Sequence, residues 1–163
     1  GYPLDACRPA WNLPLAVENL EKAIKVLPFE GNTISHLAIA YLNMGRTDDA
    51  IKTLRYGNEV DPFNADNFHM LARIYLTFYD RGAKDALALA AANCERALKI
   101  DPYYAEVYET EGMIMERLGQ IDKAEERYER AFRVNPTLPG PIAKIAELSR
   151  RVIRLEAARN LFA

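Results

Sequence analysis

The feature that most constrains the fold is a proline that returns at nearly regular intervals. Copies stand at Leu27-Pro28, Asp61-Pro62, Asp101-Pro102 and Asn135-Pro136, spaced 34, 40 and 34 residues apart, and each follows an apolar stretch of helical period. Proline lacks the backbone N–H and clashes with the preceding turn, so it marks the end of a helix. Four such stops in one phase predict a chain of repeated helical units.

Short side chains recur in phase with the prolines and divide each unit into two halves. Neighbouring apolar positions follow at intervals of three or four residues, the period of one helix face. Each unit is therefore predicted to hold two amphipathic helices joined by a turn, with Gly45 and Gly119 at two of the turns. Paired helices approach closely only where side chains are short, so Ala38 and Ala72 are expected to face the second helix at the crossing. The aligned short positions are Ala38, Ala72, Gly112 and Ala146 in the first halves, and Ala16, Ala50, Ala90 and Ala124 in the second.

One unit carries a complete recurring pattern, namely Ile34, Leu37, Ala38, Tyr41, Gly45, Ala50, Leu54 and Pro62. This pattern resembles the tetratricopeptide repeat, and its copies extend the resemblance to about nine tenths of the chain. The resemblance implies an all-α fold, a right-handed α-solenoid of antiparallel helix hairpins that forms one structural domain.

The resemblance also predicts how the chain is divided. Three prolines among the first 14 residues argue against a helix there, so the array is expected to begin with half a unit. The predicted parts are an irregular segment 1–13, a half repeat (second helix) 14–30, repeats 31–64, 65–104 and 105–138, and a capping helix 139–163.

The resemblance implies a scaffold that binds a protein or peptide along a concave groove. In a helical solenoid that groove is lined by the first helices of successive units. The predicted groove residues are the first-helix positions not needed for packing: Asn32, Ser35, Ile39, Asn43, Asp66, His69, Arg73, Thr77, Glu106, Glu109, Met113 and Glu116. The capping helix is expected to add Lys144 and Glu147.

The charges of these positions bear on the ligand. Family members that capture acidic C-terminal tails clamp carboxylates with a cluster of Lys, Arg and Asn. At the groove positions of the full units, Arg73 is the one strong cation, with Asn32 and Asn43 nearby, and the third unit is acidic. A carboxylate-clamp ligand is therefore disfavoured, and an apolar or basic stretch fits better. The competing interpretation is that these charges only solvate an exposed helix face.

Two departures from the pattern could form accessory surfaces. Unit 65–104 is six residues too long, and we expect both of its helices to extend by about one turn with Gly82 at the reversal. A tolerated insertion is favoured over a protruding knob that touches a partner through Phe78 and Tyr79. The capping segment is rich in arginine around Arg151, which favours a solubilising cap over a basic surface for an anionic partner or self-association.

Composition excludes several classes of function. The net charge is -2 with both signs interspersed, so no basic nucleic-acid footprint is present, and no apolar run approaches the ~20 residues of a membrane span. Cys7 and Cys94 form no disulfide framework, and Cys94 falls in an apolar helical register. This slightly favours a soluble cytoplasmic protein over a periplasmic one.

No catalytic or metal-binding constellation is visible in the sequence. His36 and His69 are interpreted as partly exposed histidines on helix surfaces, and no further metal ligands stand at suitable spacing. We therefore expect no enzyme activity, no metal and no cofactor.

The leading hypothesis is a protein- or peptide-binding scaffold, such as an assembly factor, with the partner left open. Two alternatives remain: a structural module that self-assembles through the ends of the solenoid, and a regulatory repeat domain of a larger protein. Glu111, which stands where a leucine is expected, has no explanation from the sequence.

Overall fold

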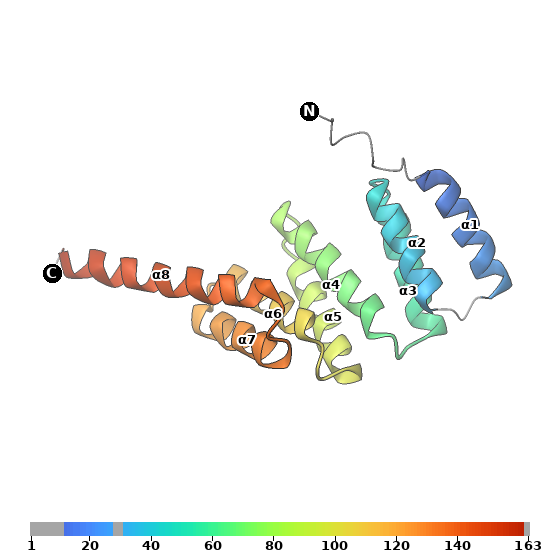
Figure 1. Ribbon diagram of the computed structural model, residues 1–163. Helices are drawn as coiled ribbons and strands as arrows, with labels where there is room; N and C mark the ends of the chain where they lie inside the picture. The colour runs from blue at the N-terminus through green and yellow to red at the C-terminus, as the bar shows by residue number, and fades with distance from the viewer. Residues whose placement is uncertain (1–11, 28–30, 162–163) are drawn as a thin grey trace, which may run out of the picture. The chain divides into compact units, whose positions relative to one another are not determined.

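A computed structural model describes residues 12–27 and 31–161, and all of their regular structure is helical (Figure 1). The all-α prediction is confirmed, whereas most of the predicted irregular segment 1–13 lies outside the described residues. None of the described helices is long and apolar enough to cross a membrane. The helices are α1 (Leu13–Val26), α2 (Gly31–Asn43), α3 (Thr47–Val60), α4 (Ala65–Asp80), α5 (Ala86–Ile100), α6 (Ala105–Arg117), α7 (Ile121–Val134) and α8 (Pro139–Leu161).

The chain divides into two compact units, and the boundary falls in the first turn of α4, after Asn67. In the first unit, α2 and α3 form a hairpin with a turn at Gly45, whose φ of +73° is the left-handed conformation predicted there. Ala38 of α2 and Ala50 of α3 are fully buried, as expected of a close helix crossing. The hydroxyl of Tyr41 donates a hydrogen bond to Glu21 and so links α2 to α1.

Gly57 is a buried glycine inside α3, and its neighbours explain why it carries no side chain. A Cβ at this position would lie 2.6 Å from Nδ2 of Asn67 and 2.8 Å from Cγ2 of Ile34. Both side chains are fully buried, and Oδ1 of Asn67 accepts a hydrogen bond of 3.0 Å from the Ser35 hydroxyl. The glycine thus provides the space that a buried polar side chain occupies.

In the second unit, the pairing of Gly112 on α6 with Tyr128 on α7 follows the same logic. Tyr128 is fully buried, and a Cβ on Gly112 would lie 2.6–2.8 Å from its ring carbons. The corresponding positions of the α2–α3 hairpin hold Ala38 and Leu54, also fully buried. A larger side chain on the second helix is therefore matched by a smaller one on the first.

The insertion lengthens the α4–α5 hairpin unequally, so the expected extension of both helices by a turn is wrong. Helix α4 has 16 residues against 13 in α2 and α6, whereas α5 has 15 against 14 in α3. Gly82 lies at the reversal with a φ of +104°. Phe78 is half-buried and packs edge-on against Tyr75, with ring centroids 6.3 Å apart, and Tyr79 is also half-buried. The aromatic residues of the insertion therefore pack partly against the protein.

Helix α8 packs on the preceding hairpin by one face only. Pro141 and Leu148 are buried, and Leu148 belongs to one cluster with Ala124 and Tyr128 of α7. Ile142, by contrast, is 50% exposed because it lies outside that face. Arg151 is exposed.

The structure supplies a role for Glu111. Its carboxylate is largely buried between α6 and α7, 3.4 Å from Nε of Arg127. Burial raises the pKa of this carboxyl, and the Arg127 charge acts in the opposite direction. Glu111 therefore belongs to the packing of the hairpin.

We predict that Gly112→Ala lowers the free energy of unfolding by about 1–3 kcal/mol, because the added methyl collides with the Tyr128 ring. Helix propensity alone would favour alanine by about 1 kcal/mol, so the sign tests the packing argument. Urea unfolding followed by circular dichroism measures the change. The double variant Gly112→Ala/Tyr128→Leu recreates the Ala38–Leu54 combination and should be more stable than the two single changes predict by addition. A neutral Gly112→Ala variant would contradict this account.

We also predict that Cys94 does not react with a thiol reagent at pH 8 until the protein unfolds. Burial, assisted by the negative charge of Glu111, raises the pKa of its thiol to about 12, and the reactive species is the thiolate. The measurement is release of thionitrobenzoate in a Cys7→Ser background, with and without urea. Rapid stoichiometric release from the native protein would show that this part of the second unit is open to solvent.

Candidate peptide-binding groove

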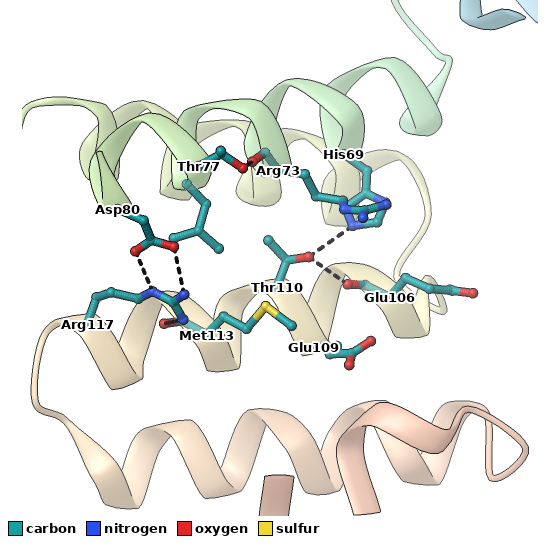
Figure 2. Close-up of a pocket in the computed structure, with 10 residues that line it drawn as sticks. His69, Arg73, Thr77, Asp80, Glu106, Glu109, Thr110, Met113 and Arg117 are labelled. Atoms are coloured by element: carbon teal, nitrogen blue, oxygen red, sulfur yellow. Dashed lines mark hydrogen bonds and ion pairs between the residues drawn. The ribbon is translucent and has the colours of Figure 1, made fainter. Parts of the chain in front are cut away.

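Helices α4 and α6 of the second unit border a groove of about 400 Å³ (Figure 2). Six residues predicted from the sequence line it, and four further residues were not predicted. The predicted ones are His69, Arg73, Thr77, Glu106, Glu109 and Met113, and the others are Leu76, Asp80, Thr110 and Arg117.

One end of the groove is closed by a polar link between His69 and Thr110. Nε2 of His69 lies 3.0 Å from the Thr110 hydroxyl, which itself donates to the backbone carbonyl of Glu106 at 2.9 Å. Because the hydroxyl proton is used there, the histidine nitrogen is the donor in the first contact. Tyr104 packs edge-on against the imidazole with ring centroids 5.0 Å apart. His69 is only 7% exposed, so the expectation of a partly exposed histidine is wrong: α6 covers it.

The other end is closed by an ion pair between Asp80 of α4 and Arg117 of α6. The guanidinium binds both carboxylate oxygens, with Nε–Oδ1 at 3.1 Å and Nη2–Oδ2 at 2.9 Å. Its third nitrogen, Nη1, donates to the carbonyl of Met113 at 3.1 Å. These bonds lower the pKa of Asp80 and raise that of Arg117. All three guanidinium nitrogens are therefore engaged within the protein.

Apart from the two links, the groove combines an apolar floor with charged walls. Leu76 is buried and Met113 is half-buried. The side chains of Arg73, Glu106 and Glu109 form no salt bridge with any other side chain that the structure describes. Burial, together with the neighbouring Glu106, raises the pKa of Glu109, while Arg73 and Lys144 oppose the shift.

Glu109 also contacts the start of α8. One of its carboxylate oxygens fills the space that a Cβ on Gly140 would need. Negative charge is favourable at the N-terminus of a helix, so α8 helps to hold this carboxylate beside the groove.

Glu116 was predicted to line the groove but serves the hairpin instead. It accepts a hydrogen bond from the buried Tyr128 and lies 3.4 Å from Nζ of Lys144. Lys144 in turn lies 3.4 Å from Glu147, so these two expected cap residues pair with each other, and Lys144 also pairs with Glu116.

The remaining predicted groove residues belong to the first unit. Ser35 bonds to Asn67, Ile39 is 43% exposed, and Asn43 and Asp66 are exposed. The side chain of Asn32 lies outside the described residues. Their role in binding a ligand stays a prediction.

Two of the four groove residues that were not predicted could have been found from their spacing in the sequence. Thr110 and Arg117 follow Glu106 and Met113 by four residues, and positions four apart share a helix face. Asp80 lies in the inserted stretch, where the repeat pattern gives no helix phase. No group of three or more residues that could hold a metal ion occurs in the described part of the chain.

Comparisons with known proteins agree with this architecture. Residues 105–138 match the Tetratricopeptide repeat family. No curated protein matches the chain.

Several solved structures share the fold at low sequence identity. MamA superposes with a TM-score of 0.70 and 24% identity, over 90% of this chain and 83% of its own. PilF of Pseudomonas aeruginosa gives a TM-score of 0.74 and 22% identity, over 91% of this chain and 65% of its own. The first tetratricopeptide repeat domain of Spaghetti (RPAP3), solved with an HSP90 peptide, gives a TM-score of 0.66 and 20% identity, over 76% of this chain and 94% of its own. The family match and the shared fold confirm the resemblance seen in the sequence: residues 105–138 match a tetratricopeptide repeat, and the chain has the fold of tetratricopeptide repeat proteins.

Proposed function

We propose that the groove between α4 and α6 binds a short segment of another polypeptide. The observation that carries this proposal is that polar links close both ends of the groove, His69–Thr110 at one end and Asp80–Arg117 at the other. Links between the two helices hold their separation, so little ordering is needed when a ligand binds. Such preorganisation increases affinity because it lowers the entropic cost of association.

The size of the groove suits a few residues of extended chain. The links are eleven residues apart on α4, from His69 to Asp80, and seven apart on α6, from Thr110 to Arg117, which at 1.5 Å per residue is roughly 16 Å and roughly 10 Å. An extended peptide advances about 3.3 Å per residue, so about three to five residues fit between the links. Leu76 and Met113 supply apolar contact, and Arg73, Glu106 and Glu109 supply charge.

The fold supports this proposal in general terms. Tetratricopeptide repeats are commonly scaffolds for protein–protein interaction, and one structural neighbour was solved with the peptide SRMEEVD bound. That peptide carries three acidic residues and one arginine. The groove described here has its own set of charges, so the same ligand is not transferred to it.

We predict that Thr77→Trp abolishes peptide binding at the groove. Thr77 is exposed on the groove wall, so an indole there fills the space while leaving the core intact. The protein is first used to select binders from a displayed library of random seven-residue peptides. Affinities of the selected peptides for both forms are then measured by fluorescence polarisation, and we expect at least a tenfold loss.

The matched control is Ala88→Trp, which places the same side chain on an exposed position of α5 outside the groove. This variant should bind as the wild type does. Selected peptides that bind Thr77→Trp and wild type equally would show that the groove is not the binding site. A selection that enriches no peptide would argue against a peptide-binding function.

A further inference from the structure

The inserted residues change the charge of the groove. Helix α4 is three residues longer than α2 and α6, and Asp80 is the last of its additional residues. A first helix of ordinary length would end before this position and would leave Arg117 without the carboxylate that holds it. The groove would then present two arginines, Arg73 on α4 and Arg117 on α6, together with two glutamates on α6.

Asp80 removes one of these arginines from the surface available to a ligand. Arg117 uses Nε and Nη2 for the Asp80 carboxylate and Nη1 for the carbonyl of Met113. A bidentate guanidinium–carboxylate pair is among the strongest charge-assisted contacts in proteins. An anionic ligand at this end would have to compete with it and would meet the Asp80 charge.

The charges that remain uncommitted favour a cation. Arg73 contributes one positive charge, and Glu106 and Glu109 contribute two negative charges, which leaves a net charge of -1. The two glutamates lie close enough to repel each other, and Glu109 is also partly desolvated. A positive group placed between them would relieve both unfavourable effects.

Apolar contact is available next to these glutamates. Glu109 and Met113 are four residues apart on α6 and share one helix face, and Figure 2 shows Met113 between Glu109 and Arg117. The flexible thioether of methionine adapts to side chains of different shape. Leu76 adds a second apolar surface from α4.

We propose that Asp80 determines the charge preference of the groove: by holding Arg117, it directs the groove to peptides with a lysine or arginine beside an apolar side chain. This inference rests on the peptide-binding function proposed above. Asp80 acts as a specificity-determining residue through Arg117 and does not itself contact the basic side chain. The insertion that carries Asp80 is thus the source of the preference.

The test uses peptides selected on the wild-type protein whose binding is lost with Thr77→Trp. We expect these peptides to be enriched in lysine or arginine next to an apolar residue. One of them is then synthesised with its basic residue intact and with that residue replaced by glutamate. Fluorescence polarisation should show at least tenfold weaker binding of the glutamate form to the wild-type protein.

Two variants break the same ion pair but should change the preference in opposite directions. Asp80→Asn releases Arg117 and removes a negative charge, so the preference for the basic peptide should fall below threefold. Arg117→Gln removes a cation and leaves Asp80 negative, so the preference should be kept or increased. If the Asp80–Arg117 ion pair acted only by holding the helices together, the preference for the basic peptide would change in the same direction in both variants. That result would overturn the proposal.

Asp85→Asn is the control for overall charge, because Asp85 is exposed outside the groove and the substitution changes the net charge by the same amount. The Asp85→Asn variant should prefer the basic peptide over the glutamate peptide as strongly as the wild type does. If it loses as much of this preference as Asp80→Asn does, Asp80 does not determine the charge preference. Groove-dependent peptides without a basic residue would refute this inference and leave the peptide-binding function standing. Peptides insensitive to Thr77→Trp would instead refute the proposed function itself.

Discussion

Close approach of paired helices at short side chains is the constraint on which the structure depends. The same space between first and second helix is filled in two ways. One hairpin uses Ala38 and Leu54, and the other uses the smaller Gly112 with the larger Tyr128. Protein interiors are packed about as densely as organic crystals, so a methyl group gained on one helix must be given up on the other. Gly57 extends this rule to a polar neighbour, because its missing side chain makes room for the buried Asn67.

Once the hairpins are packed in this way, one face of α4 is brought opposite one face of α6. Helix α5 packs against α6 and so joins the two hairpins, and the polar links at the ends of the groove add direct contacts between α4 and α6. Nε2 of His69 donates a buried hydrogen bond to the Thr110 hydroxyl, and Asp80 and Arg117 form a bidentate ion pair. The residues that line the groove are then held as walls of a preformed groove, which favours binding without large rearrangement.

The insertion shows how a change of length can act as a change of charge. Its six residues leave the core of the repeat in place because only α4 gains nearly a turn, while Gly82 reverses the chain farther along. The last residue of the longer helix then reaches Arg117. A local extension of a repeat can therefore alter the electrostatics of a shared groove without altering any residue of the original lining.

The sequence by itself determined the helices and their pairing. Proline stops such as Pro62 and the phase of Ala38 predicted them, because these signals depend only on neighbours along the chain. The same period identified six of the ten residues that line the groove. Only the tertiary structure decided that His69 is buried, that Glu116 bonds to Tyr128 and that Asp80 reaches Arg117. The physical reason is that each of these contacts joins side chains on different helices, and a helical period gives the direction of a side chain but not the group that it meets.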